Sequence, residues 1–474
     1  MSYSNQIKIL EIEPVYATPS RAEFRLPVGK LYTNNIHLAN LGVTKSAASA
    51  GLDGDSLNKL VGVYGSIKQI SIMDGNIELQ TLTRANEWLA FKSHLHSNSY
   101  NEDIAPSLSG NKKSNRQNNR DLSIKVSPDG GTTLRTSAAV ATNQVSIVGS
   151  KLVEGGVDIQ HPQVKMLETS EASTFKGQLD LAEALSFIQS VPYLDSEYFK
   201  NLKIVVEFDQ NMVGEAGAAV LGGGMGTGVV AQVRPLLICE EITTQNVVEQ
   251  MLGKTPKPFS YKVIENDVFR VPELVAPAPA TSSPAKQATT YHVSSFNNKS
   301  VGRCVIMTRT GAGVSTIQGA AAVMYGPYNS HSMYHQKNQV RVNGRNLFAR
   351  DGITRENQRL ALMADTWGAQ ASITPFQNGI AFTAADADLR SDYIEAGNEA
   401  IGTCDYFGWD LDNNVISDLQ IDYERRSYNG LTGGNDTATT VSKYNQSLDL
   451  VLFGEVSKQL IPTPSGSYNV VYSQ

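Results

Sequence analysis

Apolar and polar residues alternate with a period of two along much of the chain. These stretches are short and are separated by Gly, Pro, Asn and Asp. The alternation predicts strands at residues 23–26, 67–72, 202–208, 301–308, 448–453 and 468–472. Helices are favoured at fewer places: after Thr83, after Thr354, and over residues 179–191 and 244–252. Many short strands with turn signals between them indicate β-sandwiches or barrels.

The same pattern occurs twice in the chain. Residues 83–90 (TRANEWLA) recur as residues 354–361 (TRENQRLA) with five of eight positions identical, and each copy follows a strand that ends in Asp-Gly or Asn-Gly, at residues 70–75 and 339–344. Three more matches follow in the same order: 201–207 with 418–424, 233–240 with 448–455, and 260–264 with 467–471. Because a shared order of four matches is hard to obtain by chance, we predict a tandem repeat of one β-sandwich.

A chain of 474 residues is also longer than one hydrophobic core usually organises. We expect the first domain to span residues 1–272, with long loop insertions at about 97–175. A Pro-rich linker at 273–290 and a second domain at 291–474 would follow. Within the insertion, residues 97–121 are rich in Asn, Ser, Lys and Arg, and we expect an exposed loop there.

Charge and cysteine content narrow the classes of function. The formal net charge is −6, which disfavours a dedicated nucleic-acid binder, because such proteins concentrate Lys and Arg against phosphates. The three cysteines, Cys239, Cys304 and Cys404, are too few and too scattered for a disulfide framework or a Cys-rich zinc site. We find neither a signal peptide nor an apolar run of 18 residues, and we therefore expect no secretion by a signal peptide and no membrane span.

Three segments carry a family resemblance. Residues 177–207, residues 58–80 with the helix after them, and residues 459–468 resemble parts of the major capsid proteins of polinton-like viruses and virophage-class small double-stranded DNA viruses. The resemblance implies an all-β fold of two tandem eight-stranded antiparallel jelly rolls, a double jelly roll, with short helices in the connections. It also implies homotrimers of nearly hexagonal outline that tile an icosahedral virion shell.

The resemblance further implies which partners such a subunit has. They are other copies of the chain, in the trimer and in neighbouring capsomers, together with penton and minor capsid proteins. The expected location is the virion capsid, assembled in the cytoplasm or nucleus of a host cell. The resemblance implies no cofactor.

One glycine-rich segment and two pairs of histidines are candidate ligand sites. Residues 222–228 (GGGMGTG) lack the Gly-Lys-Ser/Thr ending and the following helix of a phosphate-binding loop, and residues 229–238 continue as a strand, so a loop between strands is favoured. His331 and His335 stand four apart but outside an amphipathic helix, and metal binding is disfavoured. His94 and His96 lie at the end of a predicted helix, where a capping role is favoured over ligation.

Acidic, basic and nucleophilic candidates lead to the same conclusion. The acidic groups Asp386, Asp388 and Asp392, and Asp410 and Asp412, lack the Gly and Glu positions of a calcium loop. A solvated loop or subunit contact is favoured over DNA binding for the basic cluster Lys112, Lys113, Arg116 and Arg120. Residues 313–315 (GVS) lack the closing Gly of a nucleophile elbow. We therefore assign no catalytic, cofactor-binding or metal residue and expect the protein not to be an enzyme.

Two other classes of function stay open at this stage. A carbohydrate- or receptor-binding two-domain β-sandwich would need exposed aromatic platforms, and Tyr406, Phe407 and Trp409 form the one cluster that could supply them. A β-sandwich hydrolase would need two carboxylates that converge in a cleft.

Overall fold

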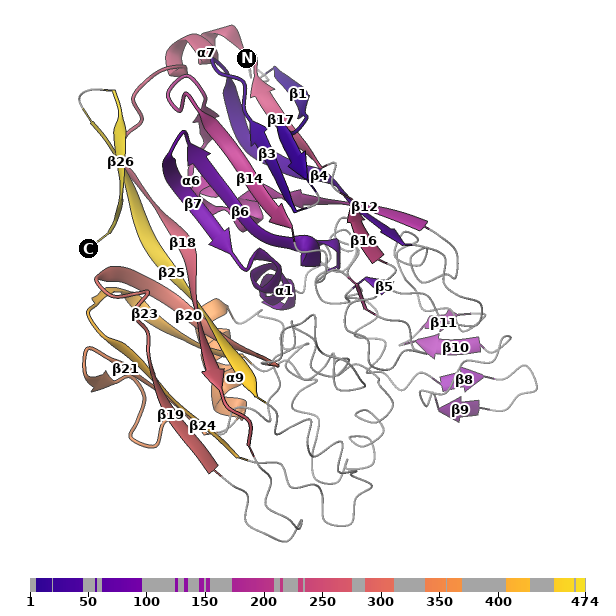
Figure 1. Cartoon of the computed structure of the whole chain (residues 1–474), viewed down its shortest axis with the longest axis vertical. Helices are drawn as coiled ribbons and strands as arrows, with labels where there is room; N and C mark the ends of the chain where they lie inside the picture. The colour runs from indigo at the N-terminus through magenta and orange to yellow at the C-terminus, as the bar shows by residue number, and fades with distance from the viewer. Residues whose placement is uncertain are drawn as a thin grey trace.

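The computed structural model places most of the strand-rich parts of the chain. The residues described are 6–18, 20–45, 56–57, 62–95, 124–126, 132–134, 145–148, 151–153, 173–208, 214–215, 229–232, 235–274, 286–310, 337–354, 356–368, 406–426, 447–463 and 466–473. They form two β-sandwiches that follow one another along the longest axis of the molecule (Figure 1).

The first sandwich is made of two antiparallel sheets. One sheet has the order β1 (Ile7–Ile12), β17 (Leu236–Ile242), β4 (Leu31–Lys45) and β12 (Ser173–Asp180). Strands β13 (Tyr193–Asp195) and β16 (Val229–Gln232) also pair with β4. The facing sheet has the order β2 (Tyr16–Thr18), β3 (Arg21–Arg25), β14 (Leu202–Phe208), β6 (Ile67–Asp74) and β7 (Ile77–Thr83).

The second sandwich is built in the same way. Its first sheet has the order β18 (Phe259–Val271), β25 (Leu448–Pro462), β20 (Lys299–Thr310) and β23 (Phe407–Ile416), with β26 (Tyr468–Tyr472) paired to β25. Its second sheet has the order β19 (Lys286–His292), β24 (Leu419–Arg426), β21 (Lys337–Val342) and β22 (Arg345–Asn346).

The two sandwiches share one topology. The eight strands common to both are, in chain order, β1, β3, β4, β6, β7, β12, β14 and β17 in the first and β18 to β25 in the second. In each sandwich the first strand lies beside the eighth, then the third and the sixth, while the second lies beside the seventh, then the fourth and the fifth. This arrangement is an eight-stranded jelly roll. The expected fold, two tandem antiparallel jelly rolls, is confirmed.

Three of the four internal matches fall on equivalent elements: helices α1 (Ala85–Leu95) and α9 (Glu356–Trp367), strands β14 and β24, and strands β17 and β25. The turns after β6 and β21 are even held alike: an Oδ1 atom of Asp74 accepts the backbone N–H of Asn201 at 2.7 Å, and Oδ1 of Asn343 accepts that of Asp418 at 3.1 Å. The fourth match, residues 260–264 with 467–471, pairs strands with different positions, because β18 is the first strand of the second roll and β26 is an additional strand beside β25.

The pairing of β18 bears on the division between the rolls, which the sequence places at residues 273–290. Strand β18 precedes the Pro-rich segment 273–290, yet it pairs with β25 along its whole length, from Phe259 opposite Leu460 to Val271 opposite Leu448. The Pro-rich segment therefore connects the first and second strands of the second roll. We propose that the division between the rolls lies between the end of β17 and the start of β18.

The insertion in the first roll contains strands. A small sheet is formed there by β8 (Ile124–Val126), β9 (Thr132–Leu134), β10 (Val145–Val148) and β11 (Lys151–Val153). Outside the insertion, the short β5 (Ser56–Leu57) pairs with β15 (Gly214–Glu215). Residues 97–121, where an exposed loop was expected, lie outside the described residues.

The few helices lie in connections between strands. Helix α1 (Ala85–Leu95) follows β7 and helix α9 (Glu356–Trp367) follows β22, as the repeated motif predicts, and α7 (Gln245–Met251) lies within the predicted 244–252. The helix predicted at 179–191 is divided into α5 (Leu181–Ala184) and α6 (Ser186–Ser190), because Leu185 is extended at φ −118° and ψ 100°. The single turn η1 (Gly62–Ser66) precedes β6.

Candidate functional site: the junction between the rolls

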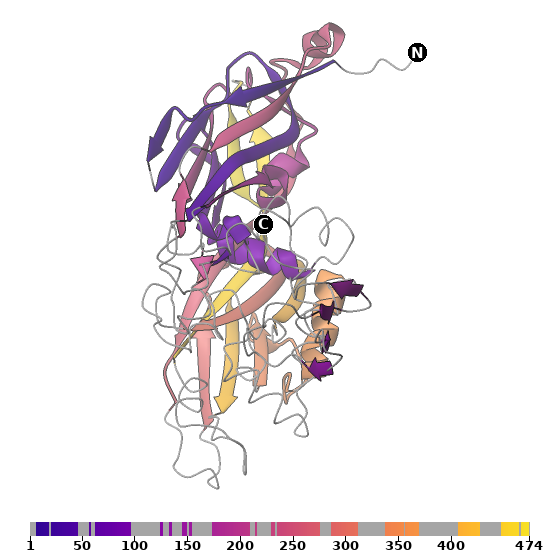
Figure 2. The ribbon, with the colours of Figure 1, turned by 90° about the vertical axis from the view of Figure 1, so that its right-hand side faces the viewer.

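The two rolls meet along a junction whose centre is aromatic. Trp88 and Phe91 of α1 pack against side chains of the second roll. The ring of Trp88 lies 5.8 Å from that of Trp367 and 5.4 Å from that of Phe453, and Phe91 lies 5.1 Å from Tyr406. Because Trp88 is only 4% exposed, α1 is buried between the rolls, and Figure 2 shows it there.

A second aromatic group closes the other end of the junction. Phe187 of α6 lies 5.2 Å from Tyr261 of β18, and Phe199 lies 5.3 Å from Tyr468 of β26. Through these two groups the buried side chains of both rolls form one continuous hydrophobic cluster. Burial of each large aromatic side chain removes roughly 150–250 Å² of surface from water. The two rolls therefore pack as one unit and are not independent domains joined by a flexible linker.

Hydrogen bonds fix the relative position of the rolls. Tyr261 Oη donates to the carbonyl oxygen of Leu79 at 2.6 Å, and Tyr468 Oη donates to Asp74 Oδ2 at 2.7 Å. Asn266 Nδ2 donates to the carbonyl oxygen of Thr83 at 3.3 Å. Each of these bonds joins the edge strand β7 or its turn to β18 or β26, so the junction has a defined register as well as an apolar centre.

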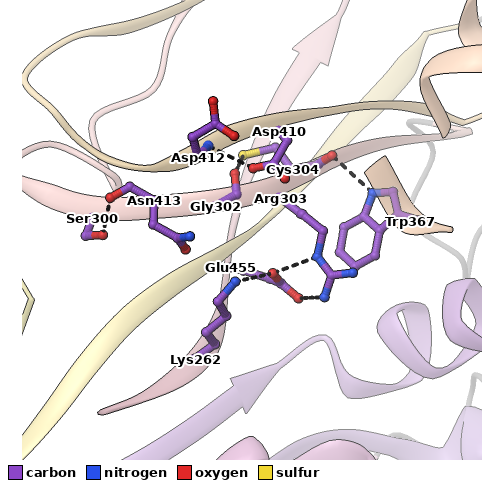
Figure 3. Close-up of polar contacts among 10 residues, drawn as sticks. All are labelled: Lys262, Ser300, Gly302, Arg303, Cys304, Trp367, Asp410, Asp412, Asn413 and Glu455. Atoms are coloured by element: carbon purple, nitrogen blue, oxygen red, sulfur yellow. Dashed lines mark hydrogen bonds and ion pairs between the residues drawn. The ribbon is translucent and has the colours of Figure 1, made fainter. Parts of the chain in front are cut away.

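Charged side chains line the junction beside α1. Glu455 of β25 is 7% exposed and accepts from Arg303 of β20 at 2.9 and 2.5 Å, while Lys262 of β18 lies 3.3 Å away (Figure 3). The Arg303 guanidinium stacks on Trp367 of α9 with its carbon 4.5 Å from the ring centre. A two-point pairing of this kind holds a buried carboxylate in place.

The pKa shifts at the junction follow from burial and pairing. The hydrogen bond to Glu455 raises the pKa of Arg303. Burial lowers the pKa of Lys92, whose Nζ donates to the carbonyl oxygen of Glu183 at 2.8 Å. Burial and the bond to Asp74 raise the pKa of Tyr468. Each of these groups is held by a hydrogen bond to a partner within the fold.

The aromatic candidates for a sugar platform are buried. Tyr406 and Phe407 are 0% exposed and Trp409 is 1% exposed, and all three pack in or against the second roll. The sequence could not reveal this, because a cluster of three aromatic residues reads equally as a core or as a surface. The platform that the carbohydrate-binding alternative required is therefore absent at these residues.

The remaining candidates are placed only in part. Asp410 and Asp412 are exposed at a register shift within β23, where Asp410 Oδ1 accepts the Asp412 N–H at 2.8 Å. In the part of the chain that the structure describes, no three His, Cys, Asp or Glu side chains are placed to share a metal ion. His94 lies in the last turn of α1. The candidates that lie outside the described residues are His96, His331, His335, residues 222–228, residues 313–315, the cluster Asp386, Asp388 and Asp392, and the basic cluster Lys112, Lys113, Arg116 and Arg120.

Cysteine and helix content add two further observations. Cys239 and Cys304 are both buried free thiols, and burial raises the pKa of Cys239 to about 12. Among the helices described, none is long and apolar enough to cross a bilayer.

Sequence reasoning missed the junction itself. Trp88 was visible as part of the repeated motif, and Tyr261 and Tyr468 as members of alternating strands. A signal was available for Trp88, because Arg359 stands at the same place in the second copy of the motif.

Comparison with solved structures agrees with the topology. A chain in a cryo-EM structure of the Sputnik virophage matches over 100% of this chain and 90% of its own length, with 10% sequence identity and a TM-score of 0.53. The mavirus major capsid protein matches 99% of this chain and 90% of its own, with 12% identity and a TM-score of 0.46. The Faustovirus major capsid protein matches 96% of this chain and 90% of its own, with 10% identity and a TM-score of 0.49.

Sequence comparison finds nothing similar: no family model and no curated protein matches the chain. The likeness is therefore one of fold, and it rests on strand order and on the full-length match to the virophage chain. The chain has the double jelly-roll fold that the resemblance in its sequence predicts.

Proposed function

We propose that this protein is the major capsid protein of a double-stranded DNA virus and that it acts by self-assembly rather than by catalysis. The observation that carries the proposal is the same eight-strand order found twice in one chain, with the two rolls fused along a buried junction. The full-length structural match to a chain of the Sputnik virophage supports it.

The fused rolls suit a hexagonal building block. Each chain contributes two similar rolls, so a ring of three chains would contain six rolls and would have a nearly sixfold outline. Closed symmetric rings of identical subunits are the usual form of soluble oligomers. In the proposed role these trimers tile the virion shell, and penton and minor capsid proteins are the expected further partners. Assembly would take place in the cytoplasm or nucleus of a host cell.

The carbohydrate-binding alternative has lost its support. Its single candidate platform is buried in the second roll. A spike built on this fold would need a different binding surface, and no described residue points to one.

Sedimentation and negative-stain electron microscopy of the purified full-length protein test the proposal. One chain weighs 51.3 kDa, and we expect a discrete species of three chains whose images show near-hexagonal particles. A protein that sediments as a single chain over a wide range of concentration and salt would contradict the capsid role. A glycan array is the complementary measurement, and selective sugar binding by a non-trimeric species would favour the spike.

A further inference from the structure

Strand β26 lies outside the eight-strand order of the second roll. The strand before it, β25, is 15 residues long, whereas its equivalent β17 in the first roll has 7 residues. Strand β18 covers one side of β25. On the other side, β20 pairs with β25 from Leu448 to Val456, and β26 pairs with it from Lys458 to Pro462. Strand β26 therefore takes the part of β25 that β20 leaves, and this part lies beside the first roll (Figure 1).

The start of β26 is held by the first roll. Tyr468 is 6% exposed, and its ring lies 5.3 Å from that of Phe199 and 5.8 Å from that of Tyr198. Its Oη donates to Asp74 Oδ2 at 2.7 Å, and Tyr198 Oη donates to the carbonyl oxygen of Ser467 at 3.2 Å. Two aromatic contacts and two hydrogen bonds thus join this end of the strand to the first roll.

The end of β26 is held by the second roll. Tyr472 Oη donates to Glu265 Oε1 of β18 at 2.6 Å. Lys299 Nζ of β20 lies 2.6 Å from Glu265 Oε2 and 4.2 Å from the centre of the Tyr472 ring. The backbone N–H of Ser300 donates to the carbonyl oxygen of Ser473 at 3.1 Å. Strand β26 therefore crosses the line along which the rolls meet, with one end bonded to each roll.

The two faces of β26 differ. Tyr468, Val470 and Tyr472 alternate along the strand and share one face, and the first two pack in or against the hydrophobic cluster. The opposite face carries Asn469 and Val471, both exposed. Among the described strands, β26 pairs with β25 alone. Because neither eight-strand order includes it, β26 can detach without opening either roll.

We propose that β26 is a clasp that opens and closes as a unit of its own and that, when closed, fixes the angle between the two rolls. Small units with few buried contacts open at a lower free energy than the whole fold. Helix α1 holds the centre of the junction, and β26 restrains rotation about that centre because its ends are bonded to different rolls. The clasp concerns one chain; its consequence, that a closed chain has the shape a three-chain ring requires, rests on the proposed capsid function.

Hydrogen–deuterium exchange of the full-length protein tests whether β26 opens by itself. We expect the amides of residues 468–473 that bond to β25 to exchange at least about tenfold faster than those of residues 448–456, because local opening costs less than global unfolding. They should exchange at least about tenfold slower than in a synthetic peptide of residues 466–474, because the closed clasp protects them. Equal rates in the two strands would overturn separate opening, and peptide-like rates would overturn the closed clasp.

Tyr468→Ala and Val471→Ala form a matched pair on the two faces of the strand. Tyr468→Ala removes the ring contacts and the hydrogen bond to Asp74, and it should accelerate exchange of β26 by about tenfold or more. Val471→Ala truncates a side chain that is 40% exposed and should change the rate by less than about threefold. Equal acceleration by both variants would overturn the clasp. If Tyr468→Ala fails to fold, Tyr468→Phe keeps the ring and should still accelerate exchange more than Val471→Ala does.

Distances between two spin labels test whether the clasp fixes the angle. Val28→Cys in the first roll and Val415→Cys in the second place the labels at positions that are 57% and 43% exposed. An excess of unlabelled wild-type chains restricts the signal to pairs within one chain, and the wild-type chain treated with the same label gives the background from its own cysteines. We expect a narrow distance distribution in the labelled chain and with Val471→Ala, and a broader one with Tyr468→Ala. A distribution that stays equally narrow with Tyr468→Ala would overturn the fixing of the angle.

Failure of the clasp and failure of the proposed function give different results. Sedimentation of the wild-type protein reports the number of chains, whereas the exchange rates of β26 and of residues 448–456 are compared within one chain. A three-chain species with equal rates in the two strands contradicts the clasp and leaves the capsid role standing. A single-chain species in which β26 opens separately contradicts the capsid role and leaves the clasp standing.

Discussion

Trp88 is the residue on which the union of the two rolls depends most. Its ring lies 5.3 Å from Phe91 in its own helix, 5.8 Å from Trp367 and 5.4 Å from Phe453, and 4% of the residue is exposed. Replacement by Ala removes nearly the whole side chain from a packed site. At about 25 cal/mol per Å² and roughly 200 Å² of buried surface, the lost burial is worth about 5 kcal/mol, and large-to-small core substitutions of Trp cost about 3–5 kcal/mol.

Urea denaturation of the Trp88→Ala variant measures this loss. We expect the free energy of unfolding to fall by about 4 kcal/mol, and we expect the single transition to separate into two as the rolls lose their coupling. Trp88→Phe keeps one ring in the site and should lose less than half as much. Val415→Ala, at an exposed position, controls for the effect of any apolar truncation. A loss below about 1 kcal/mol with one sharp transition would refute the claim that α1 joins the rolls.

Three further predictions concern single contacts in and near the second roll. Gly454→Ala should destabilise the fold by about 1–3 kcal/mol in thermal denaturation, because a Cβ atom there would lie 2.6 Å from the ring of Phe296; an unchanged melting temperature would contradict the packing. Arg303→Met should lower the free energy of unfolding in urea by about 1–2 kcal/mol, because Glu455 then keeps only Lys262 as an ion-pair partner. The partial exposure of Arg303 limits the effect. The pKa of Tyr468 is raised in the folded protein, so its stabilising contribution is complete below pH 10 and is lost as the pH rises above that value. Tyr468→Phe removes this phenol and its hydrogen bond to Asp74, and it should flatten the fall of stability between pH 9 and 11. An unchanged slope would argue against the bond.

The sequence by itself determined the class of fold and its duplication. Period-two alternation requires strands with one buried face, and it located β14 and β26 to the residue. The two tight turns were also predictable from the sequence. An Asp or Asn before Gly allows the tight turn and supplies an oxygen that accepts a backbone N–H, as Asp74 and Asn343 do. These are local properties, so a local pattern is enough to predict them.

Strand partners were decided only by the tertiary structure. Residues 260–264 and 467–471 have similar patterns, yet one belongs to the first strand of a roll and the other to an additional strand, because alternation shows which face of a strand is buried and not which strand lies beside it. For the same reason the Pro-rich segment looked like a linker between domains, although β18 before it already belongs to the second roll.

Burial of aromatic residues was likewise a matter of tertiary structure. Tyr406, Phe407 and Trp409 could have been a surface platform, and Trp88 an ordinary core residue of one roll. The first three became core and the fourth became part of the junction because packing depends on which distant segments converge. The sequence thus specified two like sandwiches, and the three-dimensional structure decided how they are joined, since contacts between residues far apart in the chain leave no periodic trace in it.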